Sequence, residues 1–176
     1  MISKIRLVAA AVGVAAVVMP MSASAAPARD PGLLQQKQPN VSYVYGQDFT
    51  VPSPVPEGNV VGRVQAVDAT SDTSGCEASD FAAFTAGNIA LIRRGTCNFS
   101  VKVANAEQAG ASGVLIFNDD SMPALITPLL GTDVTIPVLF VTRSLGEAFV
   151  TQTHDGLRVH ILVRHVPKGS PNQATS

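Results

Sequence analysis

The sequence predicts an α+β domain in which short strands outnumber two short helices. Continuous apolar runs at residues 89–92 and 114–117 are typical of strands that are buried on both faces. An amphipathic segment lies between them and stops at Gly110, so the three predict a strand–helix–strand unit with parallel strands. The apolar run at residues 136–141 predicts a further strand.

The first 25 residues have the features of a cleaved secretory signal. Lys4 and Arg6 precede an apolar stretch at residues 7–19, and residues 23–25 form an Ala-Ser-Ala cleavage signal. The apolar stretch is shorter than the roughly 20 residues that cross a bilayer. We therefore expect cleavage after Ala25, a secreted (extracellular) mature chain, and no membrane association after cleavage.

Composition divides the rest of the chain into three parts. Residues 26–40 are rich in Pro, Gln and Ala and are expected to be a flexible leader. Residues 41–166 are expected to fold as one domain, and residues 167–176 to be a disordered tail. Ten basic and thirteen acidic residues remain after signal removal, and this weak, mixed charge argues against a nucleic-acid partner.

The early part of the domain is expected to be mostly β-structure. Residues 41–45 and 60–67 are β-prone runs, joined by a proline-rich connector. A polar loop follows at residues 68–75, and residues 81–84 are expected to form one helical turn. These segments lead into the strand at residues 89–92.

Local signals bound the helix between the two buried strands. Asn98 is the expected N-cap, and Gly110 supplies the left-handed residue at the C-terminus. Lys102 and Glu107 are expected to face solvent. The apolar residues at helical spacing, which predict its buried stripe, are Phe99, Val103 and Ala106.

The C-terminal part predicts a second short helix and one more strand. Ser144 and Glu147 fit a capping box, which predicts Ser144 as the N-cap of a short helix that ends near Thr151. The run Arg158–Val163 alternates polar and apolar residues and predicts an edge strand.

Cys76 and Cys97 are the only cysteines. In an exported chain an even pair is most simply a disulfide. The bond would close a loop of about 20 residues and contribute roughly 3 kcal/mol to stability. The alternative is a nucleophilic cysteine with a histidine partner, but nothing in the sequence distinguishes either cysteine as a free thiolate.

The longest distinctive segment is IALIRRGTCNFSVKVANAEQAGASGVLIFN at residues 89–118, with Gly75-Cys76 before it and Thr-Ile-Pro-Val at residues 135–138 after it. This order, with Gly146 further on, resembles the protease-associated (PA) domain family over roughly residues 60–151. The likeness is greatest to PA domains inserted in secreted aminopeptidases and subtilisin-like proteases. The resemblance implies an open, barrel-like mixed β-structure with flanking helices. It also implies a non-catalytic role in peptide or protein recognition, substrate access or dimerisation.

The resemblance also implies a ligand-binding loop between the first buried strand and the helix. Arg94 offers planar donors for a carboxylate or for carbonyl oxygens, and Gly95 allows close approach of a backbone. The alternative is that Arg94 caps the chain's own carbonyl groups and that Phe99 belongs to the core. The candidate ligand-binding residues are Arg93, Arg94, Gly95, Thr96 and Phe99.

A second candidate surface is the apolar loop that precedes the strand at residues 136–141. Exposed apolar clusters often mark interfaces, but such residues also fold back over a core. The members of this possible interface are Met122, Leu125, Ile126, Leu129 and Leu130.

Sequence patterns for metal or catalytic chemistry are weak. The histidines are His154, His160 and His165, and no two have zinc-site spacing. Asp119 and Asp120 could bind calcium, but a polar turn after a strand is the commoner explanation. Neither a Gly-x-Ser-x-Gly motif nor a nucleophile with a credible base is found.

The favoured hypothesis is therefore a secreted, non-enzymatic domain with no catalytic residues, no metal and no cofactor. Its expected partner is a peptide segment or a secreted protein such as a protease. Two alternatives stay open. One is a fragment or accessory part of a secreted hydrolase, and the other is a structural or dimerisation module.

Overall fold

The computed structural model describes residues 30–122, 124–131 and 133–164. The expected signal at residues 1–25 and the expected tail at residues 167–176 lie outside the described residues. The described strands are β1 (Gly32–Lys37), β2 (Asn40–Ser42), β3 (Phe49–Thr50), β4 (Gly58–Val67), β5 (Ile89–Arg93), β6 (Gly113–Phe117), β7 (Val138–Val141) and β8 (Arg158–Val163). The described helices are the short 3-10 helix η1 (Ala78–Phe81), α1 (Phe99–Gln108) and α2 (Arg143–Thr153).

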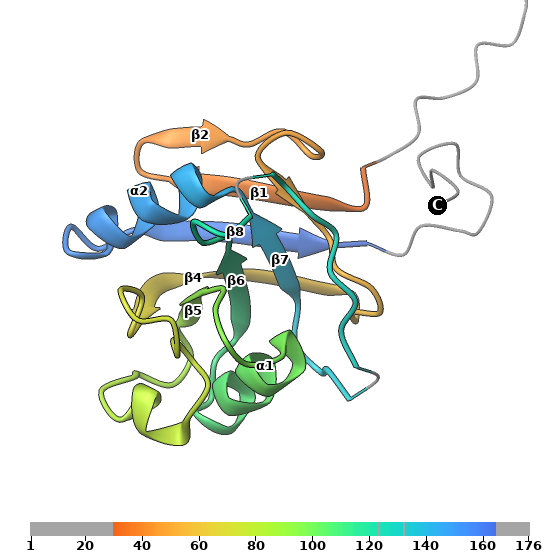
Figure 1. The fold of residues 1–176 in the computed structure, drawn as a ribbon. Helices are drawn as coiled ribbons and strands as arrows, with labels where there is room; N and C mark the ends of the chain where they lie inside the picture. The colour runs from red at the N-terminus through yellow and green to blue at the C-terminus, as the bar shows by residue number, and fades with distance from the viewer. Residues whose placement is uncertain (1–29, 123, 132, 165–176) are drawn as a thin grey trace, which may run out of the picture.

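The described strands form one mixed sheet in the order β2-β1-β8-β4-β5-β6-β7-β3, which confirms the predicted α+β class (Figure 1). Strands β4 to β7 are parallel, as predicted for the strand–helix–strand unit β5-α1-β6. Strand β4 pairs antiparallel with β8 along Gly58–Arg63 and parallel with β5 along Val64–Val67, so it joins the two halves of the sheet.

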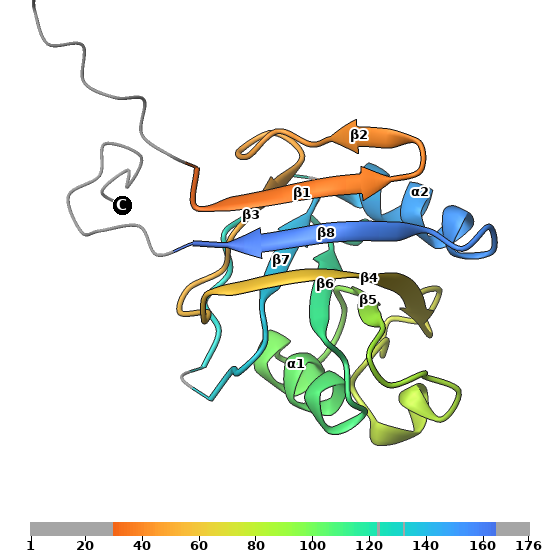
Figure 2. The same cartoon turned by 180° about the vertical axis from the view of Figure 1, so that it is seen from behind.

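The sheet curls so that its two ends approach each other (Figure 2). Gly32 of β1 lies against the segment that follows β3, because a Cβ atom at Gly32 would be 2.7 Å from Cγ2 of Val51. This close approach gives the sheet the open, barrel-like form that the family resemblance implies.

The two long helices cover opposite faces of the parallel strands. Along β6, Val114 and Ile116 pack with Val103 of α1, whereas Leu115 and Phe117 pack on the α2 side. This alternation follows from the two-residue period of a strand. Every residue of β6 is buried, as a continuous apolar run predicts.

The prediction of a flexible leader at residues 26–40 is wrong for the part that forms β1. Its residues alternate between buried and half-buried, with Leu34 in the core. The polar Gln36 is also buried, because its amide nitrogen donates to Gln152 Oε1 (2.7 Å) and its oxygen accepts from the Tyr43 hydroxyl. Because β1 pairs with β8, the prediction that β8 is an edge strand is wrong as well.

The helix ends follow the sequence signals only in part. Gly110 has a φ of +80° after the last turn of α1, as predicted. The capping box at Ser144 is wrong, because the N-cap of α2 is Thr142, two residues earlier. The Thr142 hydroxyl accepts from the amide of Leu145 at 3.3 Å. Glu147 instead bonds to Arg143 on the exposed face of the helix.

Candidate functional site

Polar side chains gather at the edge of the sheet where the parallel strands end. Arg93 and Arg94 lie at the end of β5, residues 118–120 follow β6, and Arg143 follows β7. The C-terminal ends of parallel strands are the usual ligand-binding edge of open α/β sheets. The candidate loop therefore lies at the edge where a ligand is expected.

The side chain of Arg93 forms ion pairs within the protein. Its guanidinium forms an ion pair with Asp72 and lies 3.7 Å from Oδ2 of Asp120. Asp120 also pairs with Arg143, whose Nε donates to Glu147 at 2.6 Å. Arg93 thus belongs to a chain of alternating charges that connects the loop before η1 to α2.

Arg94 makes weaker side-chain contacts and is half-buried. Its backbone amide donates to the carbonyl of Phe117 at 2.7 Å. Nη1 lies 3.3 Å from Oδ1 of Asn118 and 3.4 Å from Sδ of Met122, and the guanidinium carbon lies 5.7 Å from the centre of the Phe99 ring. No carboxylate among the described residues forms an ion pair with Arg94, so its remaining N–H groups are available to donate to a ligand.

Gly95 and Thr96 are placed by contact with the loop before η1. A Cβ atom at Gly95 would lie 1.8 Å from the carbonyl oxygen of Asp72, and the Thr96 amide donates to that oxygen at 2.9 Å. The backbone that passes close to Gly95 is therefore the protein's own. Contact of Gly95 or Thr96 with a ligand stays a prediction.

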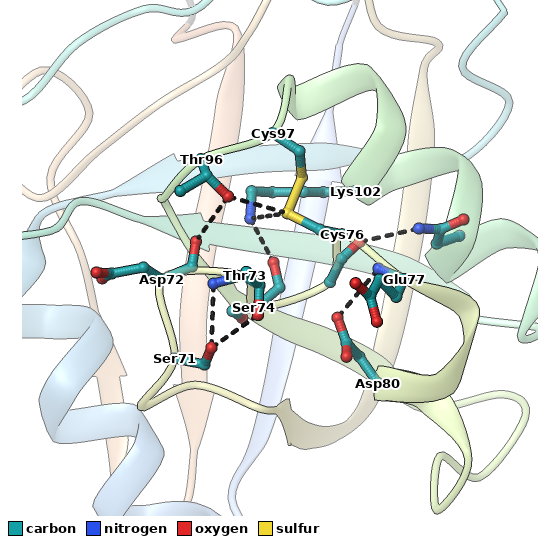
Figure 3. The surroundings of a disulfide bond; sticks show 12 residues. Ser71, Asp72, Thr73, Ser74, Cys76, Glu77, Asp80, Thr96, Cys97 and Lys102 are labelled. Atoms are coloured by element: carbon teal, nitrogen blue, oxygen red, sulfur yellow. Dashed lines mark hydrogen bonds between the residues drawn. A yellow bond between two sulfur atoms is a disulfide. The ribbon is translucent and has the colours of Figure 1, made fainter.

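The disulfide between Cys76 and Cys97 confirms the predicted pairing and ties these two loops together (Figure 3). Their Cα atoms are 5.8 Å apart. The disulfide and the hydrogen bonds from the Thr96 amide (2.9 Å) and hydroxyl (3.4 Å) to the carbonyl of Asp72 restrict the loop that carries Arg94. A restricted loop loses less conformational entropy when it binds a ligand.

The prediction that Lys102 faces solvent is wrong, because its side chain has no exposed surface. Nζ donates to the carbonyl oxygen of Ser74 and lies 3.6 Å from Sγ of Cys76 (Figure 3). Burial lowers the pKa of Lys102 to about 8, Asp80 and Asp119 oppose this shift, and Arg93 adds to it. The sequence held a signal for this burial: Lys102 is three residues after Phe99 and four before Ala106, on the predicted buried stripe.

Asn118 is a site residue that the sequence did not single out. Its side chain is fully buried, accepts from Arg94 and donates through Nδ2 to the carbonyl of Ala124 at 2.5 Å. It therefore connects the guanidinium of Arg94 to the apolar loop. A lone asparagine after a strand is usually a turn residue, so no sequence signal marked this role.

Asp119 and Asp120 behave as a polar turn. Oδ1 of Asp119 accepts from the amide (3.0 Å) and hydroxyl (2.6 Å) of Ser121. Burial alone would raise the pKa of Asp119, but the bonds from Ser121 and the nearby Arg94 and Arg93 lower it overall. The turn therefore stabilises the deprotonated carboxylate of Asp119 relative to the protonated acid.

The apolar loop does not form one surface. Leu130 is buried, Leu125 and Ile126 pack partly against the core on the α1 side, and Met122 and Leu129 are exposed, the latter by 83%. Three of the five residues, Leu125, Ile126 and Leu130, therefore fold back over the core, as the alternative interpretation expects. A role for Met122 and Leu129 in an interface stays a prediction.

The described residues contain no group of three or more side chains that could hold a metal ion. His160 contacts Oδ1 of Asn59 at 2.7 Å, and His165 lies outside the described residues. None of the described helices is long and apolar enough to cross a membrane.

Comparison with known proteins points to peptidases that are much longer than this chain. The family model of the PA domain matches residues 57–149. An aminopeptidase from Pseudomonas aeruginosa is 44% identical over 151 residues, which are 80% of this chain and 28% of that protein.

Two solved structures share the fold. The aminopeptidase from Aneurinibacillus sp. strain AM-1 superimposes with a TM-score of 0.64 at 21% identity, covering 77% of this chain and 31% of that one. BSAP, a zinc aminopeptidase from Bacillus subtilis, has a TM-score of 0.58 at 27% identity, covering 76% and 30%. The chain thus spans less than a third of the length of each of these aminopeptidases.

Proposed function

The chain belongs to the PA domain family, and on this premise we propose that it is a secreted, non-catalytic domain that binds a peptide segment or a partner protein. The relatives named above are aminopeptidases, and the chain spans less than a third of the length of each. This supports a role as an accessory domain of a peptidase. The partner would then be a substrate segment or the peptidase itself.

The observation that carries the proposal is that the guanidinium of Arg94 lacks an ion-pair partner among the described residues. Its neighbour Arg93 is paired with two carboxylates, whereas Arg94 forms an ion pair with none of the described residues. A guanidinium presents five donors in a plane, which suits backbone carbonyls or a carboxylate. The exposed thioether of Met122, next to Arg94, offers contact to an apolar side chain of the same ligand.

The direct test compares Arg94→Ala with Arg158→Ala, which removes an exposed arginine on β8 away from this edge. Peptides selected from a random heptapeptide library on the intact protein serve as the probe, and titration by fluorescence anisotropy gives Kd. Loss of a hydrogen bond to a charged donor costs about 1.5–3 kcal/mol. We therefore expect Arg94→Ala to weaken binding roughly tenfold or more, with Tm nearly unchanged.

Two outcomes count against the proposal. Equal Kd values for Arg94→Ala and Arg158→Ala would place the binding site elsewhere. Loss of folding in Arg94→Ala would mean that the contacts to Asn118 and Met122 are structural.

A catalytic role remains the second candidate, because the named relatives are aminopeptidases. Purified protein is tested on aminopeptidase substrates and on casein. Turnover that a chelator or a serine reagent abolishes would replace the binding proposal with a hydrolase.

A dimerisation role is favoured by one observation, the exposure of Leu129. Light scattering measures the mass in solution. A stable dimer that dissociates in Leu129→Asp would support this role, whereas Leu125→Asp would test folding instead because Leu125 is partly buried.

A further inference from the structure

We propose that Cys97 is the position at which small external thiols modify this protein, and that Lys102 directs the attack there by stabilising Cys76 as the departing thiolate. The co-reactant is a low-molecular-weight thiol such as glutathione. The product is a mixed disulfide on Cys97.

The two sulfur atoms of the disulfide have different surroundings (Figure 3). Sγ of Cys76 lies 3.6 Å from the ammonium group of Lys102 and 4.0 Å from the hydroxyl of Thr96. No such polar contact to the sulfur of Cys97 is found among the described residues. Lys102 reaches Cys76 from α1, in a position where its side chain is fully buried and held by the carbonyl of Ser74.

This difference selects the leaving group in thiol–disulfide exchange. An external thiolate attacks one sulfur, forms a new S–S bond with it, and expels the other sulfur with the electron pair of the old bond. The reaction is faster when the departing thiolate is the more stable one. Attack at Cys97 expels Cys76 beside a cation, whereas attack at Cys76 would expel Cys97 with no such neighbour. The external thiol and Cys97 end as a mixed disulfide, and Cys76 ends reduced.

One feature acts in the opposite direction. Cys97 lies just before the N-cap Asn98 of α1, and the partial positive charge of a helix N-terminus also stabilises a thiolate. That partial charge is about half of a unit charge and is spread over several amides, whereas Lys102 carries a unit charge in contact with Cys76. The ammonium group therefore has the larger effect.

The other charges that face Lys102 set the pH range of this effect. Asp80 of η1 and Asp119 after β6 favour its ammonium form, and Arg93 of β5 opposes it. Because burial lowers the pKa of Lys102 to about 8, the ammonium form still predominates at pH 7. The preference for Cys97 should therefore decline above pH 8.

Modification would also free the loop that precedes η1. That loop holds Asp72, which accepts from Thr96 and pairs with Arg93. Its release would loosen the loop that carries Arg94. This consequence rests on the proposed binding role of Arg94, but the modification itself does not.

The test locates glutathione on the folded protein. The chain is incubated with reduced glutathione at pH 7, quenched with acid within seconds, alkylated and mapped by mass spectrometry. We expect on the order of tenfold more glutathione on Cys97 than on Cys76. Lys102→Met should bring the ratio close to one, and Lys102→Arg should retain the excess. Glutathione mainly on Cys76, or an unchanged ratio in Lys102→Met, would overturn the proposal.

A second measurement does not depend on how well the Lys102 variants fold. Cys97→Ser leaves Cys76 as a free thiol beside Lys102, and Cys76→Ser leaves Cys97 as its matched control. Iodoacetamide reaction rates as a function of pH give each thiol pKa. We expect Cys76 to titrate below the usual value of about 8.5 and below Cys97. The reverse order would also overturn the proposal.

Discussion

The buried ammonium of Lys102 makes the stability of the protein depend on pH in the alkaline range. Because its pKa is lowered in the folded protein, the unfolded chain holds this proton at pH values where the folded chain has lost it. Stability rises with pH wherever the unfolded state binds more protons. The free energy of unfolding should therefore increase between pH 8 and 10.5, through the titration of this one group.

The magnitude follows from the two pKa values. The fall from 10.5 to about 8 corresponds to about 3 kcal/mol, since a tenfold change in a proton-binding constant is worth 1.36 kcal/mol. About 2.5 kcal/mol of this should be present at pH 10, and almost none at pH 7. Lys102→Met removes the titrating group. It also removes the bond to the carbonyl of Ser74, and the free energy lost with that bond should be about the same at every pH.

The assay measures urea unfolding of the native and Lys102→Met proteins at half-unit steps from pH 7 to pH 10, with the disulfide intact in both. Subtracting one free energy from the other cancels all other titrating groups. We expect the native protein to gain about 2–3 kcal/mol relative to the variant over this range. A difference that stays constant with pH would refute the reasoning, because it would mean that the folded protein solvates the ammonium group well.

Two further predictions concern single contacts and have matched controls. Gly95→Ala should lower stability by about 2–3 kcal/mol, because a Cβ atom 1.8 Å from the Asp72 carbonyl must push the two tethered loops apart. Gly131→Ala, where the nearest atom is 3.8 Å away, should be nearly neutral, and equal Tm values for the two variants would contradict this account. Thr142→Ala should cost about 1 kcal/mol through loss of the N-cap bond, whereas Ser144→Ala should change little. A larger loss of stability in Ser144→Ala than in Thr142→Ala, measured by chemical denaturation, would instead identify Ser144 as the N-cap.

Local patterns predicted the central part of the fold because the signals there are short-range. The buried strands β5 and β6 are continuous apolar runs. The chain adopts a positive φ where α1 ends, and Gly110 supplies it. The disulfide could be predicted because only one pairing was available. Strand β1 could not be predicted, because its inner face contains Gly32 and Gln36 as well as Leu34. A buried glutamine is stable only through partners such as Gln152, which is distant in sequence.

The candidate site shows the same limit. Arg93 and Arg94 are adjacent in the sequence and look equivalent, yet only Arg93 forms ion pairs among the described residues, with Asp72 and Asp120. Those carboxylates belong to two other loops, whose approach depends on the tertiary fold. The burial of Lys102 likewise depends on a carbonyl that is 28 residues away. Sequence alone could identify the loop but not which of its cations is available.

The pairing of β1 and β8, the first and last described strands, also determines how this domain can be combined with other chains. Gly32 at the start of β1 lies opposite Val163 at the end of β8, and the amide of Arg164 donates to the carbonyl of Pro31 at 2.8 Å. The polypeptide therefore enters and leaves the fold side by side, separated by about one interstrand spacing of roughly 5 Å. A surface turn of a host enzyme could be opened to accept the whole domain while its two sides stay in place. The whole domain could thus be inserted into or deleted from a host enzyme without changing the packing of the host's core.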